Sequence, residues 1–320
     1  MKYVNFKRDK VNYKTMCDLW NNTYGYIYPI SQELFERNTS NIYEKASFIV
    51  YNEEEIVAFI ISKIWIDKFF IPTYLESGWI SLFFVAPKYR CQGIGSKLLE
   101  FAENELRKCG KTSIFLGKDY LNFFPGLPVD LKNSEDWFKK RGYERPYDTF
   151  DLIKQIKGLN CKKLPLKNQD IQFRIANIED KEKLLSFMKK NWPGRWLKET
   201  IDYFENGGTG SEYVIGVDNN NVCAFAKIGY PNTDINLISY SLTWRNRFDA
   251  LGGIGPLGVD SSYRHRNLGY DIVAFANNIL VDANATDIII DWTGLLDFYR
   301  HMGFEVFKSY YYMSKNDKKI

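Results

Sequence analysis

Hydrophobic and polar positions alternate along two stretches of the chain, residues 48–63 (FIVYNEEEIVAFIISK) and 213–228 (YVIGVDNNNVCAFAKI). In each stretch, two alternating segments flank a short polar turn. Alternation with a period of two is typical of β-strands that bury one face, and a polar turn between two such strands predicts a hairpin. The same hairpin is therefore expected once in each half of the chain.

A further hydrophobic strand follows the first hairpin and leads into a loop and a helix, over residues 81–96 (SLFFVAPKYRCQGIGS) and beyond. Gly93 and Gly95 have no Cβ, so the loop backbone can approach a ligand and point successive N–H groups at phosphate oxygens. The helix adds the positive end of its dipole. The loop itself contains no G-x-G-x-x-G, and no Lys-Ser/Thr pair follows its glycines. The pattern therefore predicts a pyrophosphate ligand that needs no metal.

This strand–loop–helix pattern returns in the second half, at residues 257–270 (LGVDSSYRHRNLGY). The helix ends at 137–144 and 298–305 are also similar, and the three matched blocks occur in the same order. An internal repeat of this length predicts two copies of one domain, and 320 residues suffice for both. A polar, lysine-rich segment broken by Gly and Pro separates the copies. We expect a domain over 1–157, a linker over 158–170 and a second domain over 171–320.

Residues 85–99 (VAPKYRCQGIGSKLL) resemble motif A of the GCN5-related N-acetyltransferases (GNAT). In that family the strand–loop–helix unit holds the pyrophosphate and pantetheine of acetyl-coenzyme A. The resemblance implies an α/β (α+β) fold with two tandem GNAT-like domains, each a mixed, mostly antiparallel sheet flanked by helices. It assigns the cofactor to Phe83, Phe84, Val85, Arg90, Cys91, Gln92, Gly93, Ile94, Gly95 and Ser96 in the first half, and to Leu257, Gly258, Val259, Arg264, Arg266, Asn267, Leu268, Gly269 and Tyr270 in the second.

The activity that this resemblance implies is direct acetyl transfer from acetyl-coenzyme A to a primary amine of a small molecule or peptide. Many members place a tyrosine near the cofactor sulfur as the acid, and Tyr299 occupies that place in the second half. Phe138 occupies it in the first half, where it cannot donate a proton. Asn267 replaces the first loop glycine in the second half, although Asn tolerates a left-handed backbone. Either half, or both, could therefore bind the cofactor.

Several alternatives remain open at this stage. The two departures also suit a non-catalytic acyl-coenzyme A sensor or scaffold, and Tyr299 could be a packed core aromatic. Glu76 and Asp291 are candidate bases by position only, whereas the two histidines, His265 and His301, are expected to be exposed or capping residues. Segments 123–130 (FFPGLPVD) and 192–196 (WPGRW) could each line an acceptor site or form a packed turn.

The composition of the chain gives no reason to expect nucleic-acid binding, a structural metal or a membrane-spanning segment. A net charge of +4 and the lack of a basic aromatic stripe give no reason to expect nucleic acid. The five cysteines are scattered without C-x-x-C spacing, which argues against structural zinc and indicates a reducing compartment. No run is apolar for long enough to span a membrane, and residues 1–10 lack the apolar core of a signal peptide. We expect a cytoplasmic protein without a metal, and its oligomeric state is undetermined.

Overall fold

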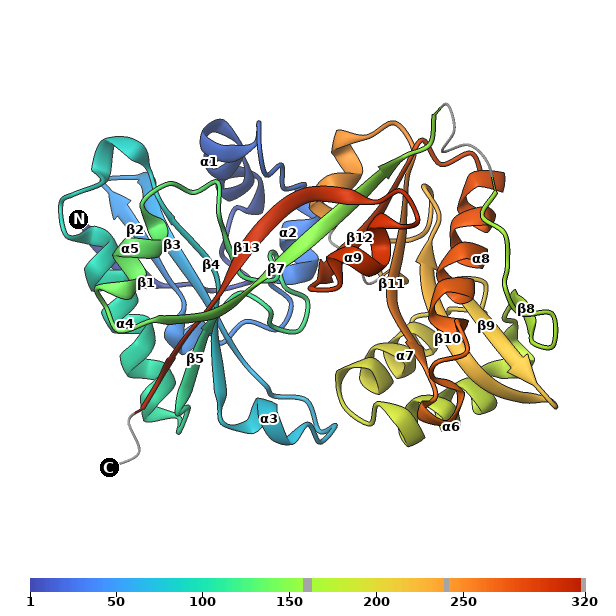
Figure 1. Cartoon of the computed structure of the whole chain (residues 1–320). Helices are drawn as coiled ribbons and strands as arrows, with labels where there is room; N and C mark the ends of the chain where they lie inside the picture. The colour runs from blue at the N-terminus through green and yellow to red at the C-terminus, as the bar shows by residue number, and fades with distance from the viewer. Residues whose placement is uncertain (158–162, 239–241, 318–320) are drawn as a thin grey trace. The chain divides into compact units, whose positions relative to one another are not determined.

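The computed structural model describes residues 1–157, 163–238 and 242–317, and it divides into two compact units. Unit 1 contains Met1–Thr149 together with Ser309–Ile320, and unit 2 contains Phe150–Lys308 (Figure 1). Residues 158–162 of the expected linker lie outside the described residues, and the domain limits inferred from sequence stay a prediction. Two long strands cross the division between the units, β7 (Glu144–Gln155) and β13 (Glu305–Asn316). Unit 1 is thus completed by the C-terminal end of the chain.

Unit 1 is a mixed sheet with helices packed on it. Its sheet order is β1-β2-β3-β4-β5-β13, and every neighbouring pair is antiparallel except β4 and β5. The elements are β1 (Lys2–Asn5), α1 (Tyr13–Tyr24), α2 (Gln32–Asn38), β2 (Phe48–Asn52), β3 (Glu55–Ile64), α3 (Pro72–Leu75), β4 (Ser77–Val85), α4 (Ile94–Lys108), β5 (Ser113–Leu116), β6 (Leu127–Pro128) and α5 (Ser134–Lys139). Its core joins the apolar face of α4 to β3, β4 and β5.

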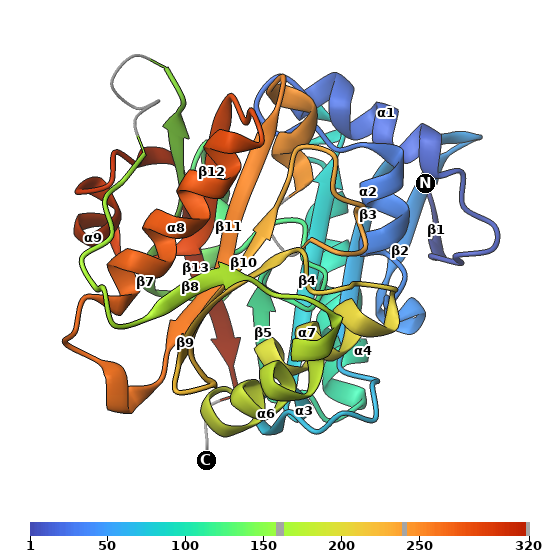
Figure 2. The same ribbon diagram turned by 90° about the vertical axis from the view of Figure 1, so that its right-hand side faces the viewer.

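Unit 2 repeats this plan in the order β7-β12-β11-β10-β9-β8, with β11 and β12 as its parallel pair. The elements are β8 (Gln172–Ile175), α6 (Lys181–Asn191), α7 (Arg195–Glu205), β9 (Tyr213–Asp218), β10 (Asn221–Gly229), β11 (Leu251–Val259), α8 (Leu268–Asp282), β12 (Asp287–Thr293) and α9 (Leu296–Arg300). Figure 2 shows α8 across one face of this sheet. Both expected hairpins, β2–β3 and β9–β10, are confirmed, as is the fold class.

In each unit the parallel pair separates partway along its length. The β4–β5 register runs from Ser77 opposite Ser113 to Ile80 opposite Leu116, after which β4 continues to Val85 paired with β3 alone. In unit 2, β11 likewise continues past its last pairing with β12 to Val259. Such a splay leaves backbone donors and acceptors of one strand available to an extended ligand.

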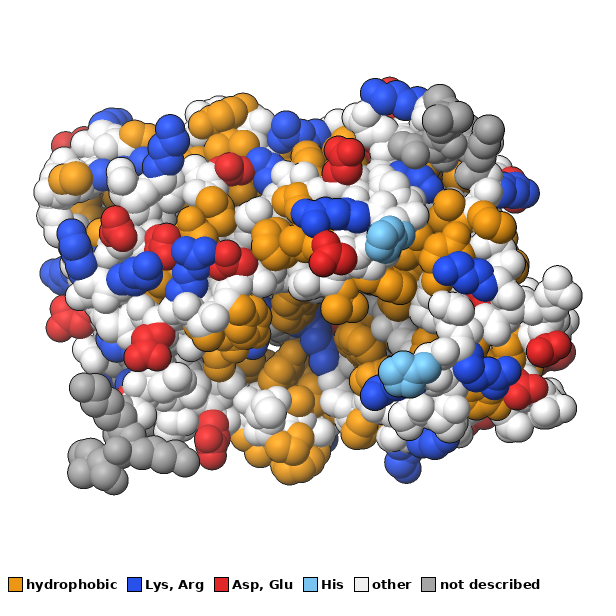
Figure 3. All heavy atoms as spheres, in the orientation of Figure 1, with side chains coloured by type: hydrophobic (Ala, Val, Ile, Leu, Met, Phe, Trp, Pro, Cys, Tyr) orange, Lys and Arg blue, Asp and Glu red, His pale blue; other side chains and the backbone are white. Residues whose placement is uncertain are grey.

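The surface and the helices show two further features. On the face drawn in Figure 3, basic and acidic side chains are interspersed, as expected from the small net charge. Among the helices of the described residues, none is both long and apolar enough to cross a membrane.

Candidate functional site

A cavity of about 590 Å³ lies in unit 1 beside the free edge of β4. The splay gives it one wall, and the loop between β4 and α4 closes one side. Its lining comes from segments far apart in the sequence: Trp20, Tyr24, Ile80, Ser81, Leu82, Phe83, Val85, Arg90, Cys91, Gly93, Gly95, Ser96, Leu116, Gly117, Phe124, Gly126, Leu127, Pro128, Leu131, Lys132, Asn133, Ser134, Trp137, Phe138 and Arg141. The site is thus a concave, mostly apolar pocket with a polar loop at its edge.

The loop before α4 has the geometry of an anion cradle. Cys91 and Gly93 have left-handed backbones, with φ of 59° and 80°, and Gly93 is the N-cap of the 15-residue helix α4. A Cβ built on Gly93 would meet no atom within 4 Å, so the space beside this backbone is open. The first N–H groups of α4 have no partner within the helix and carry its positive dipole end. An anionic group can therefore approach them directly.

Two arginines place positive charge around this cradle. The guanidinium of Arg90 donates from Nε to the Val85 carbonyl, at 2.9 Å, and from Nη2 to the Tyr24 hydroxyl, at 2.9 Å. Arg141 lies over the Trp137 ring, 3.6 Å from its centroid, and donates to Ser96 Oγ at 2.7 Å. Arg90 thus ties the loop to β4 and α1, while Arg141 holds a cation against the first turn of α4.

Seven of the ten residues that sequence comparison assigned to the first cradle line the cavity, and three do not. Phe84 is buried on the opposite face of β4 and stacks on Phe59, with ring centroids 5.3 Å apart. The Gln92 side chain donates to the Lys88 carbonyl, and Ile94 is buried in the core under α4. The alternation of side chains along a strand explains why Phe83 and Val85 line the cavity and Phe84 does not.

The remaining walls were not identified from the sequence. Trp20 and Tyr24 come from α1, and Trp137 comes from α5, where no local pattern marks them as site residues. Segment 123–130 combines both roles considered for it. Phe124 lines the cavity and is only 4% exposed, while Leu127 pairs with Tyr311 of β13. Of these walls, the sequence indicated only the proline-containing loop after β5, residues 123–130.

The second loop, before α8, has the same backbone form as the first. His265 and Asn267 have φ of 62° and 59°, and Asn267 is the N-cap of α8, which also has 15 residues. Asn267 therefore keeps the left-handed turn that Gly93 makes in unit 1. The other assigned residues surround this turn: Arg264 and Arg266 are exposed, Leu268 is buried, and Leu257, Gly258, Val259, Gly269 and Tyr270 are half-buried. Their assignment to the cofactor stays a prediction.

Unit 2 differs from unit 1 along the splayed strand. Gly258 faces Phe225 on β10 just as Phe84 faces Phe59 in unit 1. The indole of Trp192 fills the volume that a side chain at 258 would need, and it packs on Phe225 at 5.4 Å between ring centroids. Segment 192–196 is therefore a packed corner. Pro256, within β11, has no backbone N–H to donate.

We expect Gly258→Ala to destabilise the protein by about 1–3 kcal/mol, because the added methyl group overpacks a filled site. A Cβ at this position would lie 2.3 Å from Trp192 Cη2. Gly294→Ala is the matched control, since a Cβ there would meet no atom within 4 Å. Urea unfolding of both variants measures the difference. Equal free energies of unfolding for the two variants would contradict this packing account.

Tyr299 lies in the core of unit 2 on α9, only 4% exposed. Its hydroxyl is hydrogen-bonded to the Thr293 side chain, and burial raises its pKa above the ordinary value. Asp291 is half-buried, whereas Glu76, His265 and His301 are exposed. In unit 1, Phe138 is buried at the end of α5 and lines the cavity. Groups on that cavity that could donate a proton include Tyr24, Ser96 and Ser134.

The fold and this site define a class of proteins, those with an acetyltransferase domain. Such a domain has a mixed sheet that splits between two parallel strands, and a left-handed loop and a long helix lie at the split. The sequence model of the acetyltransferase (GNAT) family matches residues 13–124. Residues 13–124 therefore form a GNAT-type acetyltransferase domain, and unit 2 repeats its fold, as in tandem GNAT proteins. Acetyl-coenzyme A is the acyl donor of the family in general.

Solved structures agree in fold. A GCN5-related glucosamine N-acetyltransferase region of a fungal multi-domain GH3 β-N-acetylglucosaminidase is 23% identical, with a TM-score of 0.85 over 98% of this chain, and this chain spans 38% of the length of that protein. A GCN5-related N-acetyltransferase from Sphaerobacter thermophilus is 12% identical, with a TM-score of 0.71 over 98% of this chain and 95% of its own. A tandem GNAT protein from the clavulanic acid biosynthesis pathway is 12% identical, with a TM-score of 0.67 over 98% of both chains.

Proposed function

We infer that this protein is an N-acetyltransferase that transfers the acetyl group of acetyl-coenzyme A to a primary amine of a small molecule or peptide. The observation that carries this inference is the unit 1 cavity of about 590 Å³, which joins the phosphate cradle at Gly93 to the free edge of β4. Both parts of the cofactor that the family recognises, the pyrophosphate and the extended pantetheine arm, have a matching surface in one continuous space.

The residues present fit this cofactor. The open space at Gly93 admits a phosphate, and the N-terminal end of α4 and the Arg141 cation supply charge of the right sign. The free edge of β4 can pair with the pantetheine amides as an added strand would. When bound, acetyl-coenzyme A supplies an activated thioester. The chain's own part is to hold that thioester in place, exclude water and orient the amine.

The acceptor side of the cavity favours a small molecule. Trp20, Tyr24 and Phe124 are aromatic side chains on its wall, and such faces suit the C–H surface of a compact ring. The similar fungal region is described as a glucosamine N-acetyltransferase. An amino sugar is therefore the first acceptor to test, followed by spermidine, lysine and a peptide with a free N-terminus.

Release of coenzyme A thiol from acetyl-coenzyme A, followed with each of these amines, tests the proposed activity. Amine-dependent release and a mass increase of one acetyl group on the amine are the expected results. Tight cofactor binding without turnover on any of the amines would instead favour the second candidate, an acyl-coenzyme A sensor or scaffold. The replacement of a tyrosine by Phe138 in unit 1 is the specific observation in favour of that candidate.

If Tyr299 is the acid of a second catalytic centre in unit 2, Tyr299→Phe should lower turnover about 100-fold with cofactor affinity unchanged, because only the transition state needs the proton. The comparison is made in a Gly93→Val background, where residual turnover belongs to unit 2. Tyr213→Phe is the matched control, since Tyr213 is also buried and its hydroxyl is likewise bonded to a threonine, Thr200. Equal turnover of the two variants would remove Tyr299 from the mechanism.

A further inference from the structure

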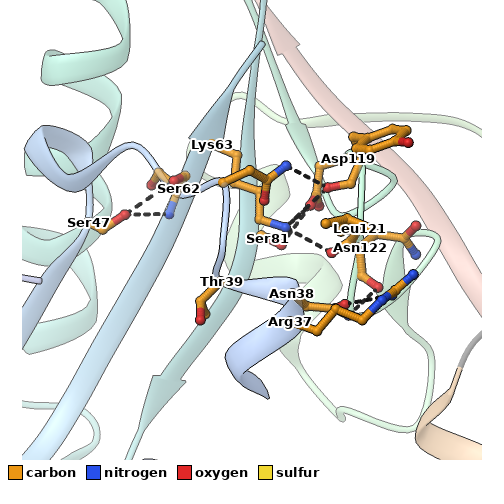
Figure 4. A network of polar contacts seen from close by, with 12 residues as sticks. Arg37, Asn38, Thr39, Ser47, Ser62, Lys63, Ser81, Asp119, Leu121 and Asn122 are labelled. Carbon is orange, nitrogen blue, oxygen red and sulfur yellow. Dashed lines mark hydrogen bonds and ion pairs between the residues drawn. The ribbon is translucent and has the colours of Figure 1, made fainter. Parts of the chain in front are cut away.

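A buried polar network of unit 1 includes Ser81, at the point where the pairing of β3 and β4 becomes irregular (Figure 4). The register between β3 and β4 shifts at this point: Ile61 faces Leu82, and Ser62 faces Ile80. Ser81 is therefore the additional residue of a β-bulge. Bulges near sites re-aim a side chain out of the alternating pattern of the strand.

Three side chains form the centre of this network, and all three are almost fully buried. Ser81 is 3% exposed, and its hydroxyl donates to Asp119 Oδ2 at 2.9 Å. Lys63 Nζ lies 2.6 Å from the same carboxylate, and each of these two side chains is 1% exposed. Lys63 also donates to the carbonyls of Tyr120 and Leu121, at 3.2 and 2.8 Å. The positions of the carboxylate and the ammonium are thus fixed from several sides.

This arrangement determines the direction of the Ser81 hydroxyl. A hydroxyl has one proton to donate and two lone pairs, and an ionised carboxylate can only accept. The Ser81 proton is therefore committed to Asp119. Because Ser81 also lines the cavity, the oxygen that remains on that side is a hydrogen-bond acceptor.

We propose that Ser81 is the contact of unit 1 for the acceptor amine and that Asp119, held by Lys63, is the positioning residue that orients the Ser81 hydroxyl. This proposal rests on the proposed acetyl transfer. An amine that donates one N–H to Ser81 has its nitrogen fixed at the splay, and its lone pair is then directed away from Ser81. The site selects a nucleophile that can donate a hydrogen bond.

Asp119 acts here by orientation and does not take the amine proton. The Asp119 carboxylate is already bonded to the Ser81 hydroxyl and to the Lys63 ammonium. Proton release from the amine proceeds to water, as it does for an amine that titrates near neutrality.

The test compares Ser81→Ala with Ser47→Ala, using the amine that the protein acetylates fastest in the panel named above. Ser47 is a matched control because it is buried, and its hydroxyl is bonded to the Tyr43 and Ser62 carbonyls, away from the cavity lining. In Ser81→Ala, kcat/KM for the amine should fall about tenfold or more, while the affinity for acetyl-coenzyme A stays unchanged. In Ser47→Ala, both quantities should match the unmodified protein.

A double-mutant cycle tests the positioning role of Asp119. Asp119→Asn should also lower kcat/KM for the amine, and in the Ser81→Ala background it should cause no further loss, because its effect acts through Ser81. A purely structural role would give additive losses. If the unmodified protein transfers acetyl to one of the amines and Ser81→Ala behaves like Ser47→Ala, this proposal is wrong and the proposed function stands. If the unmodified protein acetylates none of the amines, both are wrong.

Discussion

Replacing Gly93 by valine should lower the affinity of unit 1 for acetyl-coenzyme A at least 100-fold. The branched side chain would occupy the open space in which the phosphate meets the first N–H groups of α4. It would also strain a backbone at φ of 80°, which β-branched residues rarely adopt. Equilibrium dialysis with radiolabelled acetyl-coenzyme A measures the loss as the disappearance of one site.

Gly110→Val separates the loss of binding from the strain. Gly110 follows α4 in the same unit, has φ of 82°, and also has no atom within 4 Å of a built Cβ. The two variants should therefore lose similar stability, about 1–2 kcal/mol for a left-handed backbone with a side chain. Of these two glycines, Gly93 lines the cavity and Gly110 does not. If Gly93→Val binds acetyl-coenzyme A with unchanged affinity, or if Gly110→Val loses as much affinity as Gly93→Val, the cradle assignment is wrong.

Asp119→Ala should destabilise unit 1 by about 3–5 kcal/mol, because it leaves the Lys63 ammonium buried without its carboxylate. Thermal unfolding followed by circular dichroism measures it as a lower Tm of the protein.

The double variant Lys63→Met/Asp119→Leu should recover much of that stability, since apolar side chains of similar volume replace the pair and no charge stays buried. The pair formed by Lys14 and Asp18 on α1 gives the contrast. Its side chains are 73% and 54% exposed, so Asp18→Ala should change the stability by well under 1 kcal/mol. A small effect of Asp119→Ala, or a double variant less stable than Asp119→Ala, would show that burial does not govern this pair.

The elements that the sequence predicted well are those specified by local pattern. Alternation identified both hairpins, and the helix expected after the first glycine loop is α4, on which Leu98, Ala102 and Leu106 bury one face. The cradle was also predictable. A left-handed backbone just before a helix favours glycine or asparagine, and Gly93 and Asn267 both adopt it.

The walls of the cavity could not be predicted, because they depend on contacts between distant segments. Trp20 meets Phe84 and Phe124 only after the sheet has formed. The pairing of β13 with β5 joins residues at opposite ends of the chain. The β-bulge at Ser81 could not be predicted either, because one additional residue does not change the hydrophobic pattern of this strand. The hydrophobic periodicity of a segment predicts which face of its helix or strand is buried. It does not predict which other segment packs on that face.

The two units differ in which segment supplies the aromatic side chain at one position of the splayed strand. At one position of the splayed strand, unit 1 has Phe84, packed against Trp20, and unit 2 has Gly258 under Trp192. In both units an aromatic side chain therefore packs over this position of the splayed strand. The loops before α4 and α8 keep one backbone form through this change.

We infer that the cradle of unit 1 binds acetyl-coenzyme A and that the loop of the same form in unit 2 is a second cradle. Calorimetric titration of the unmodified protein with acetyl-coenzyme A tests this inference most directly, because the heat gives both affinity and stoichiometry. We expect two sites per chain, one of which is lost in Gly93→Val. A titration without binding heat across a range of temperatures, or two full sites in Gly93→Val, would contradict it.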